Sequence, residues 1–224
     1  WIGIYAKRSD CVLVFEGARA DGSLVKARKG VGIYEIEVKG VAAHAGNDHQ
    51  KGRSAVLELA HWILALSPLT DYAAGTTVNV GIVKGGTVSN VVPETAYAKV
   101  DIRFWKTSEF ERVEQTLKAL QQTPFTHDVR VELGRRSFKP AMELSAGSEA
   151  LMAVVETAAA AVGEDIGWVA VGGGSDANYT AALGVPSLDG FGPIGGNYHG
   201  EKEFLRLDSV IPRIRMVQEL LRRL

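Results

Sequence analysis

The sequence predicts an α/β domain, with a mostly parallel sheet and flanking helices, that is interrupted by an inserted α+β sandwich of βαββαβ order. Two observations lead to this fold class. Short apolar runs near both ends of the chain are typical of interior strands of a mostly parallel sheet. Between them, alternating strand patterns switch twice to helical spacing. We therefore divide the chain into residues 1–29, 30–140 and 141–224, of which the first and last form one α/β domain.

Composition restricts the partners that the chain is expected to have. Its 224 residues are 46% hydrophobic and 23% charged, which is ordinary globular material. The formal net charge of −1 provides no field that would gather nucleic acid or an anionic membrane surface. No apolar stretch approaches the roughly 20 residues of a membrane span. We expect a small-molecule or peptide substrate, and neither nucleic acid nor a membrane as partner.

The first segment contains one predicted buried strand, residues 11–15, followed by a polar, glycine-containing connection at residues 17–29. That connection fits a linker or a hairpin. The last segment, residues 141–224, offers only two or three strands, too few for a sheet of its own. The strand at residues 11–15 is therefore expected to join them.

The middle segment shows the pattern of a ferredoxin-like sandwich. Its strands are predicted at residues 33–38, 76–83, 95–104 and 127–133, and its helices at residues 53–66 and 108–120. Ser108 and Glu111 match a capping box at the start of the second helix. This order predicts a four-stranded antiparallel sheet with both helices on one face. The other face and the edges remain available for a partner.

The last segment returns to an α/β pattern. Helices are predicted at residues 148–162, 175–183 and 210–224, and strands at residues 167–171 and 185–188. Asp208 is the expected cap of the final helix. The apolar stripe of that helix is predicted to consist of Ile211, Ile214, Val217, Leu220 and Leu221.

Two candidate metal ligands lie near opposite ends of the sequence. Glu16 directly follows a predicted buried strand, so its carboxylate is expected at the carboxyl edge of the sheet, where ligands of open α/β sheets bind. His199 lies in a glycine-flanked loop, where nothing bulky would keep a metal away. One carboxylate and one imidazole suit zinc, and manganese or cobalt would also accept them. A solvated glutamate and a surface histidine are the alternatives.

Three further residues could contact a substrate. His44 comes just after the first strand of the sandwich and could donate a hydrogen bond to a developing oxyanion. Asn90 supplies an amide in a loop, and Arg135 supplies a guanidinium whose planar fork matches a carboxylate. The alternatives are a histidine satisfied by nearby backbone, a turn asparagine and a solvated charge.

A glycine turn at residues 172–177 connects a predicted strand to a helix. It lacks the Gly-x-Ser-x-Gly pattern of a nucleophile elbow and the Gly-Lys-Ser or Gly-Lys-Thr of a P-loop. Gly173, Gly174 and Ser175 are therefore predicted to hold an anionic group of the substrate through free amides. Ser175 also fits a helix N-cap, and nucleotide binding is a weaker alternative.

Six short motifs follow one another in an order that resembles the M20 family of metallopeptidases, in particular its glutamate carboxypeptidase and aminoacylase branch. They are Val14-Phe15-Glu16, Ala43-His44-Ala45-Gly46, Val88-Ser89-Asn90-Val91-Val92-Pro93, Gly134-Arg135, Gly172-Gly173-Gly174-Ser175-Asp176-Ala177 and Tyr198-His199. The resemblance implies two zinc ions bridged by an Asp and a water, with a Glu as general base. It makes Glu16 a terminal ligand of one metal and His199 of the other.

The resemblance also implies roles for the inserted domain. Residues 30–140 would be a lid that forms a homodimer, and His44 from the opposite subunit would steady the tetrahedral intermediate. Asn90 and Arg135 would hold the substrate, with Arg135 taking its C-terminal carboxylate. The implied reaction of the intact protein is zinc-dependent hydrolysis of a peptide or amide bond that releases a C-terminal, glutamate-like amino acid. Deacylation of N-acyl amino acids and a noncatalytic dimerisation or scaffold role are the alternatives.

One part of the family pattern is not found in this sequence. The His-x-Asp pair, the bridging Asp and the Glu-Glu pair would lie upstream of Trp1. Stable zinc sites use three or four protein ligands. We therefore expect the chain by itself to be inactive and to bind metal weakly at best.

Overall fold

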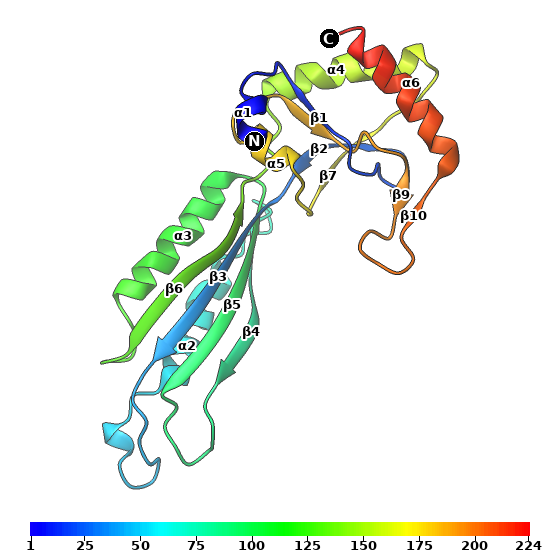
Figure 1. Ribbon diagram of the computed structural model, residues 1–224. Helices are drawn as coiled ribbons and strands as arrows, with labels where there is room; N and C mark the ends of the chain where they lie inside the picture. The colour runs from blue at the N-terminus through cyan, green and yellow to red at the C-terminus, as the bar shows by residue number, and fades with distance from the viewer. The chain divides into compact units, whose positions relative to one another are not determined.

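The computed structural model describes all 224 residues, and they divide into two compact units. The first unit comprises residues 1–30 and 140–224, and the second comprises residues 31–139 (Figure 1). The predicted fold class is confirmed: the first unit has a mostly parallel sheet with helices, and the second has a four-stranded antiparallel sheet with two helices.

Four strands form the main sheet of the first unit in the order β1-β8-β2-β7. They are β1 (Val12–Val14), β2 (Leu24–Arg28), β7 (Trp168–Val171) and β8 (Ser187–Asp189). The pairs β1/β8 and β2/β7 are parallel, whereas β2 and β8 are antiparallel. A small antiparallel ladder of β9 (Gly195–Gly196) and β10 (Phe204–Leu205) lies apart from this sheet.

The prediction of a linker or hairpin at residues 17–29 was wrong, because this segment contains the strand β2. Leu24 and Val25 are fully buried between the neighbouring strands. In the sequence, the charged residues Lys26 and Arg28 interrupt the apolar run by which a buried strand is recognised. Arg28 can end an interior strand because its charge is paired inside the unit, as described below.

The helices of the first unit are α1 (Ile2–Ala6), α4 (Ala146–Ala161), α5 (Ala177–Ala181) and α6 (Val210–Leu221). The core contains residues of α4, β2, β8 and α6, including Val155, Leu24, Leu188 and Met216. The predicted apolar stripe of α6 is wrong in part, because Ile211, Ile214 and Leu221 are exposed. Helix α6 packs against α4, and the face that it buries contains Arg213, Met216 and Leu220 instead.

The second unit is the sandwich, with strand order β4-β5-β3-β6. Its strands are β3 (Gly30–Lys39), β4 (Thr77–Gly85), β5 (Thr95–Phe104) and β6 (Arg130–Lys139), and its helices are α2 (Ala55–Leu66) and α3 (Thr107–Gln122). Every second residue of β3 and β5 is buried, which shows that both helices cover the same face of the sheet. Three short 3₁₀ turns, His49–Lys51, Ser67–Leu69 and Leu207–Ser209, complete the elements of the chain.

Two predicted helix caps are corrected by the structure. Helix α3 begins at Thr107 after Lys106, with no side-chain cap bond, so Ser108 and Glu111 do not form a capping box. Helix α6 follows Ser209, and Asp208 belongs to the preceding 3₁₀ turn, where it pairs with Arg206. In both cases helical backbone begins one residue before the predicted cap, at Thr107 for Ser108 and at Leu207 for Asp208. None of the helices is long and apolar enough to cross a membrane.

Candidate functional site

A pocket of about 350 Å³ in the first unit brings together most of the predicted site residues. It contains both candidate metal ligands, Glu16 and His199, and the three residues of the glycine turn. Its remaining lining residues are Gly17, Arg19, Arg28, Tyr198 and Glu203. The first and last parts of the sequence therefore meet at one site.

Close packing between Gly17 and Tyr198 places His199 near Glu16. The Tyr198 hydroxyl donates a hydrogen bond to the Ala18 carbonyl at 2.6 Å. A Cβ on Gly17 would lie 2.6 Å from that hydroxyl, so only glycine leaves room for the ring. Burial raises the pKa of Tyr198, which keeps the phenol protonated as a donor. This contact seats the His199 loop on the segment that follows β1.

The His199 loop is held in an uncommon backbone conformation. Asn197 and His199 have φ angles of 57° and 65°, in the left-handed region. The main-chain N–H of His199 donates to Glu203 Oε2 at 3.2 Å, and the β9/β10 ladder closes the loop. Glu203 thereby becomes a second carboxylate at the pocket, one that the sequence analysis did not select.

The donor types at this pocket suit zinc, but the set is incomplete. Glu16 and His199 supply one carboxylate and one imidazole. No group of three or more His, Cys, Asp or Glu side chains is arranged to hold a metal ion in the structure. The residues of this chain therefore fit only part of a zinc site, which normally uses three or four protein ligands.

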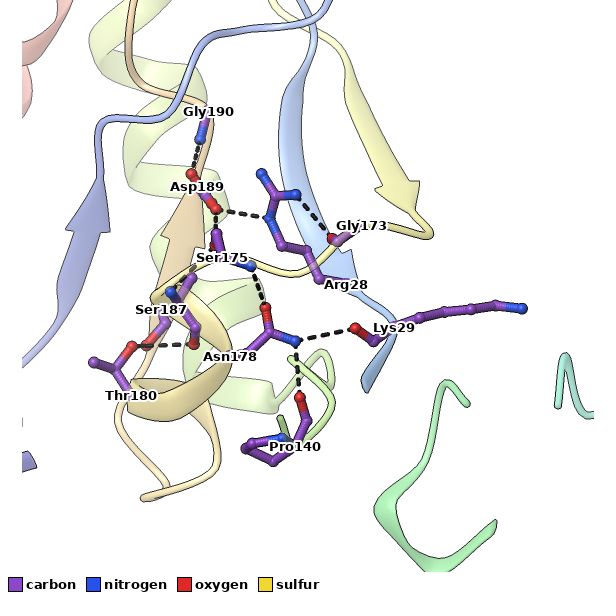
Figure 2. A network of polar contacts seen from close by, with 11 residues as sticks. Arg28, Lys29, Pro140, Gly173, Ser175, Asn178, Thr180, Ser187, Asp189 and Gly190 are labelled. Atoms are coloured by element: carbon purple, nitrogen blue, oxygen red, sulfur yellow. Dashed lines mark hydrogen bonds and ion pairs between the residues drawn. The ribbon is translucent and has the colours of Figure 1, made fainter. Parts of the chain in front are cut away.

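A buried ion pair contacts the glycine turn (Figure 2). Arg28 Nε lies 2.7 Å from Asp189 Oδ2, and Arg28 Nη1 donates to the Gly173 carbonyl at 3.0 Å. Only 4% of Arg28 and none of Asp189 is exposed. The Gly190 N–H donates to the other carboxylate oxygen of Asp189 at 2.5 Å. The turn is thus held by a buried ion pair, and both carboxylate oxygens of Asp189 have hydrogen-bond partners.

Ser175 is also held inside this network. Its hydroxyl donates to Asp189 Oδ2 and accepts the N–H of Ala177 at 3.2 Å. Its main-chain N–H donates to Asn178 Oδ1 at 2.8 Å. Both groups of Ser175 are engaged within the chain, whereas the N–H groups of Gly173 and Gly174, two residues that line the pocket, make no main-chain hydrogen bond. The alternative of Ser175 as the helix N-cap is wrong, because the N-cap position of α5 is Asp176 and Ser175 lies one residue before it.

Two arginines at the pocket were missed from the sequence. The guanidinium of Arg19 lies 5.6 Å from the centre of the Tyr198 ring, and its buried Nε has no hydrogen-bond partner. Arg28 ends β2, which is antiparallel to β8, so the carboxyl-edge rule that selected Glu16 does not select Arg28.

Within the sandwich, His44 and Asn90 lie side by side. His44 forms an isolated bridge with Val91, and the Ala45 N–H donates to the Asn90 carbonyl at 2.9 Å. His44 is exposed, and its Nδ1 accepts hydrogen bonds from main-chain amides of its own turn. The structure therefore combines these two predicted residues in one loop cluster.

Arg135 is placed differently from the prediction. It lies in the middle of β6, opposite Tyr34, and not at a strand end. Its Nη1 donates to Glu114 Oε1 at 3.1 Å, and its guanidinium lies 5.4 Å from the Phe138 ring centre. Since Lys39 pairs with Arg130, Arg135 lies about 17 Å along the strand from the end that leads to His44. The sandwich does not bring Arg135 to the His44 and Asn90 cluster.

Comparisons with known proteins agree with this architecture. The peptidase dimerisation domain of the M20 family matches residues 26–129. Carboxypeptidase G2 of Pseudomonas sp. (strain RS-16) is 31% identical over 96% of this chain and 53% of its own length. The uncharacterized protein YqjE of Bacillus subtilis is 26% identical over 88% of this chain and 52% of its own length. The chain thus spans about half the length of these relatives.

Solved structures share the fold over nearly the whole chain. Aminopeptidase PepT from Bacillus cereus has a TM-score of 0.81 at 23% identity and covers 97% of this chain and 58% of its own. A tripeptidase from Staphylococcus aureus has a TM-score of 0.72 at 20% identity and covers 97% of this chain and 60% of its own. These solved structures show the fold, and the matches to the dimerisation domain and to carboxypeptidase G2 identify the chain as a member of the M20 peptidase family.

Proposed function

We propose that the intact protein is a zinc-dependent peptidase or amidase that releases a C-terminal amino acid, as glutamate carboxypeptidases do. The observation that carries this proposal is the meeting of Glu16 and His199 in one pocket with open amides and two guanidinium groups. A carboxylate and an imidazole at a sheet edge suit a metal, and the nearby donors suit the oxygen atoms of an amide substrate.

Glu16 and His199 would be the metal ligands that this chain contributes. Zinc bound there would supply a polarised water as the nucleophile. Because two ligands are too few for a stable site, we propose that the chain by itself is inactive and that the further ligands come from elsewhere in the intact protein. The amides of Gly173 and Gly174 would bind a substrate oxygen, while Arg28 and Asp189 hold those amides in place.

The cationic side of the pocket favours an acidic substrate. Arg19 and Arg28 both line it, and although Arg28 is paired with Asp189, Arg19 Nε is buried without a partner. An anionic group there would be stabilised by paired N–H donors. By resemblance, Asn90 and Arg135 are also proposed to hold the substrate. A substrate carboxylate would then have to displace Glu114 from Arg135.

Deacylation of N-acyl amino acids is the second candidate. The indole-3-acetyl-aspartic acid hydrolase of Enterobacter agglomerans is 46% identical over 65 residues, which cover 29% of this chain and 15% of that protein. Its name describes an acidic amino acid that carries an acyl group. That class of substrate would also use the arginines of the pocket, so the two candidates differ in the acyl group on the carbonyl side of the scissile bond.

We further propose that the sandwich forms a homodimer. Strand β4 lies at the edge of the sheet, where Ile82 and Val83 are exposed, and α2 exposes Leu57 and Leu64. An edge strand with apolar neighbours is suited to pairing with a second copy. By resemblance, the dimer would deliver His44 to the partner's pocket. A noncatalytic dimerisation or scaffold role remains the alternative for the chain alone.

Light scattering of the 224-residue chain tests the dimer. The expected result is a dimer that Val83→Glu converts to a monomer, whereas Leu207→Glu, at an exposed position of the first unit, leaves it unchanged. A monomeric wild-type chain, or a dimer that Val83→Glu leaves intact, would refute this interface.

Hydrolysis by the intact protein tests the reaction. Glu16→Ala and His199→Ala should each lower zinc content and reduce turnover of peptides ending in glutamate by at least about 10²-fold, the scale of losing a metal-site contact. Glu201→Ala, at an exposed position of the same loop, is the control. Turnover of N-acyl amino acids without turnover of peptides would select the second candidate. Absence of both activities in the zinc-loaded protein would leave the scaffold role.

A further inference from the structure

The turn that follows His44 surrounds one nitrogen of its imidazole with donors. The main-chain N–H groups of Gly46 and Asn47 both point at His44 Nδ1, each at 3.1 Å. The same turn is closed by the Asp48 N–H, which donates to the His44 carbonyl at 3.0 Å, and by the Ala45 N–H on the Asn90 carbonyl. The ring orientation is therefore fixed by main chain, and not by another side chain.

A nitrogen that accepts two hydrogen bonds from N–H groups cannot itself carry a proton. Neutral imidazole has one donor and one acceptor nitrogen. The hydrogen-bond partner of one nitrogen therefore decides whether the other nitrogen carries the proton. We infer that the amides of Gly46 and Asn47 lock neutral His44 in the Nε2–H tautomer, so that it acts through Nε2 as a hydrogen-bond donor.

This assignment excludes two other roles for His44. A general base at Nε2, or a neutral metal ligand at Nε2, needs the proton on Nδ1. A proton on Nδ1 would point at two N–H groups, so the turn would have to open. The ligand that fits the exposed Nε2–H is an oxygen acceptor, such as the carbonyl or developing oxyanion of an amide substrate.

The catalytic meaning of this lock rests on the proposed function, but the lock itself belongs to the 224-residue chain. Gly46 and Asn47 are positioning residues in this scheme, because they act through His44. A Cβ on Gly46 would lie 3.4 Å from His44 Cε1, in ordinary contact, so the side chain of residue 46 is of little consequence. What matters is the N–H of each residue.

Imidazole ¹⁵N spectra of the chain at mildly alkaline pH test the lock directly. The expected result is a single Nε2–H form for His44, assigned with His44→Ala, against a mixture of both tautomers for the exposed His49. Asn47→Pro deletes one of the two N–H donors and leaves that of Gly46, so it should weaken the lock and let a minor Nδ1–H form appear beside the Nε2–H form. Asn47→Ala keeps the N–H of residue 47 and should keep the single form. A His44 spectrum with the proton on Nδ1, or one unaffected by Asn47→Pro in a folded chain, would overturn the inference.

Two substitutions at His44 separate the acceptor from the donor. Asn places an oxygen near the position of Nδ1, whereas Gln places an N–H₂ near the position of Nε2. In the chain, hydrogen exchange of the Gly46 and Asn47 amides should stay slow in His44→Asn and become fast in His44→Gln.

In the intact protein, activity should rank the two variants in the opposite order, with His44→Gln above His44→Asn. His44→Asn should lower kcat by about 10²- to 10³-fold, the loss seen when an oxyanion donor is removed, and His44→Gln should retain more activity. Higher activity of His44→Asn than of His44→Gln would overturn the donor role. A confirmed tautomer with unchanged kcat in both variants would leave the lock standing and remove His44 from the proposed reaction.

Discussion

Arg28 and Asp189, which are 161 residues apart in the sequence, form a buried ion pair with Nε 2.7 Å from Oδ2. Arg28 ends β2 and Asp189 ends β8. The pair also binds the Gly173 carbonyl and the Ser175 hydroxyl (Figure 2). It therefore joins the first and last segments of the α/β unit at the base of the candidate site.

Breaking this pair should be costly. Arg28→Met leaves Asp189 buried without its counter-charge, and we expect a loss of about 3 to 5 kcal/mol in the free energy of unfolding. Arg206→Met is the matched control, because the Arg206–Asp208 pair has the same 2.7 Å separation on exposed side chains. In urea unfolding, the control should lower stability far less than Arg28→Met does, because an exposed ion pair contributes little. Equal losses in the two variants would contradict the central role of the buried pair.

Ser175→Ala should affect stability more than chemistry. The variant removes the hydroxyl that donates to Asp189 and accepts a hydrogen bond from the Ala177 N–H, at an expected cost of about 1 to 3 kcal/mol. Since the hydroxyl is engaged with Asp189, we expect it to have no role as a nucleophile. Hydrolysis by the intact protein at a temperature where the variant is folded should fall by less than about tenfold, a change of about 1.4 kcal/mol in barrier. Complete loss of activity in a folded variant would argue for a direct role of Ser175.

Gly17→Ala should disturb the His199 loop. The new Cβ would meet the Tyr198 hydroxyl at 2.6 Å and a ring carbon at 3.0 Å, so the ring must move. We expect a loss of about 1 to 3 kcal/mol in stability from overpacking and a changed chemical shift for the His199 amide. Gly172→Ala is the control, because its Cβ would have no atom within 4 Å. A Gly17→Ala variant with unchanged stability and an unchanged His199 amide shift would show that the Tyr198 contact does not position His199.

Acid should remove part of the stability of the sandwich through Glu109. Its pKa is lowered by the hydrogen bond from Arg112, and Thr76 adds a further bond. A carboxyl whose pKa is lower in the folded state stabilises the fold above its unfolded pKa, about 4.3, and this contribution is lost as pH falls through the lowered value. Glu109→Gln should therefore cost up to about 1 kcal/mol at pH 7 and nearly nothing at pH 2.

Arg112→Gln provides the partner control for this prediction. It removes the hydrogen bonds that lower the pKa of Glu109, so it should remove most of the same pH-dependent increment. Urea unfolding of the three proteins across this pH range measures the effect. An equal cost of Glu109→Gln at both pH values would contradict the linkage.

Regular alternation made much of the fold predictable. The strand predicted at residues 95–104 is β5 (Thr95–Phe104), because every second residue is apolar and packs under the helices. The same local logic placed Glu16 after a strand and His199 among glycines, and both line one pocket. Patterns of this kind depend on neighbours within a few residues, which the sequence displays directly.

Features that depend on distant partners were missed. The strand β2 was read as a polar connection because Arg28 looks like a surface charge until Asp189 is placed beside it. Arg135 was read as a strand-end ligand, but the pairing of β3 with β6 places it in mid-strand beside Glu114. The cap at Ser108 failed because α3 begins one residue earlier, at Thr107, and the cap at Asp208 failed because a 3₁₀ turn contains this residue and Ser209 precedes α6.

By itself, the sequence determined the α/β unit, the inserted sandwich and the pair of candidate ligands. Tertiary structure alone decided which charges are buried, which serine is tied to Asp189 and which nitrogen of His44 faces its own turn. The physical reason is that apolar periodicity follows from the geometry of a single strand or helix. The state of a polar group instead depends on the partner that folding brings to it.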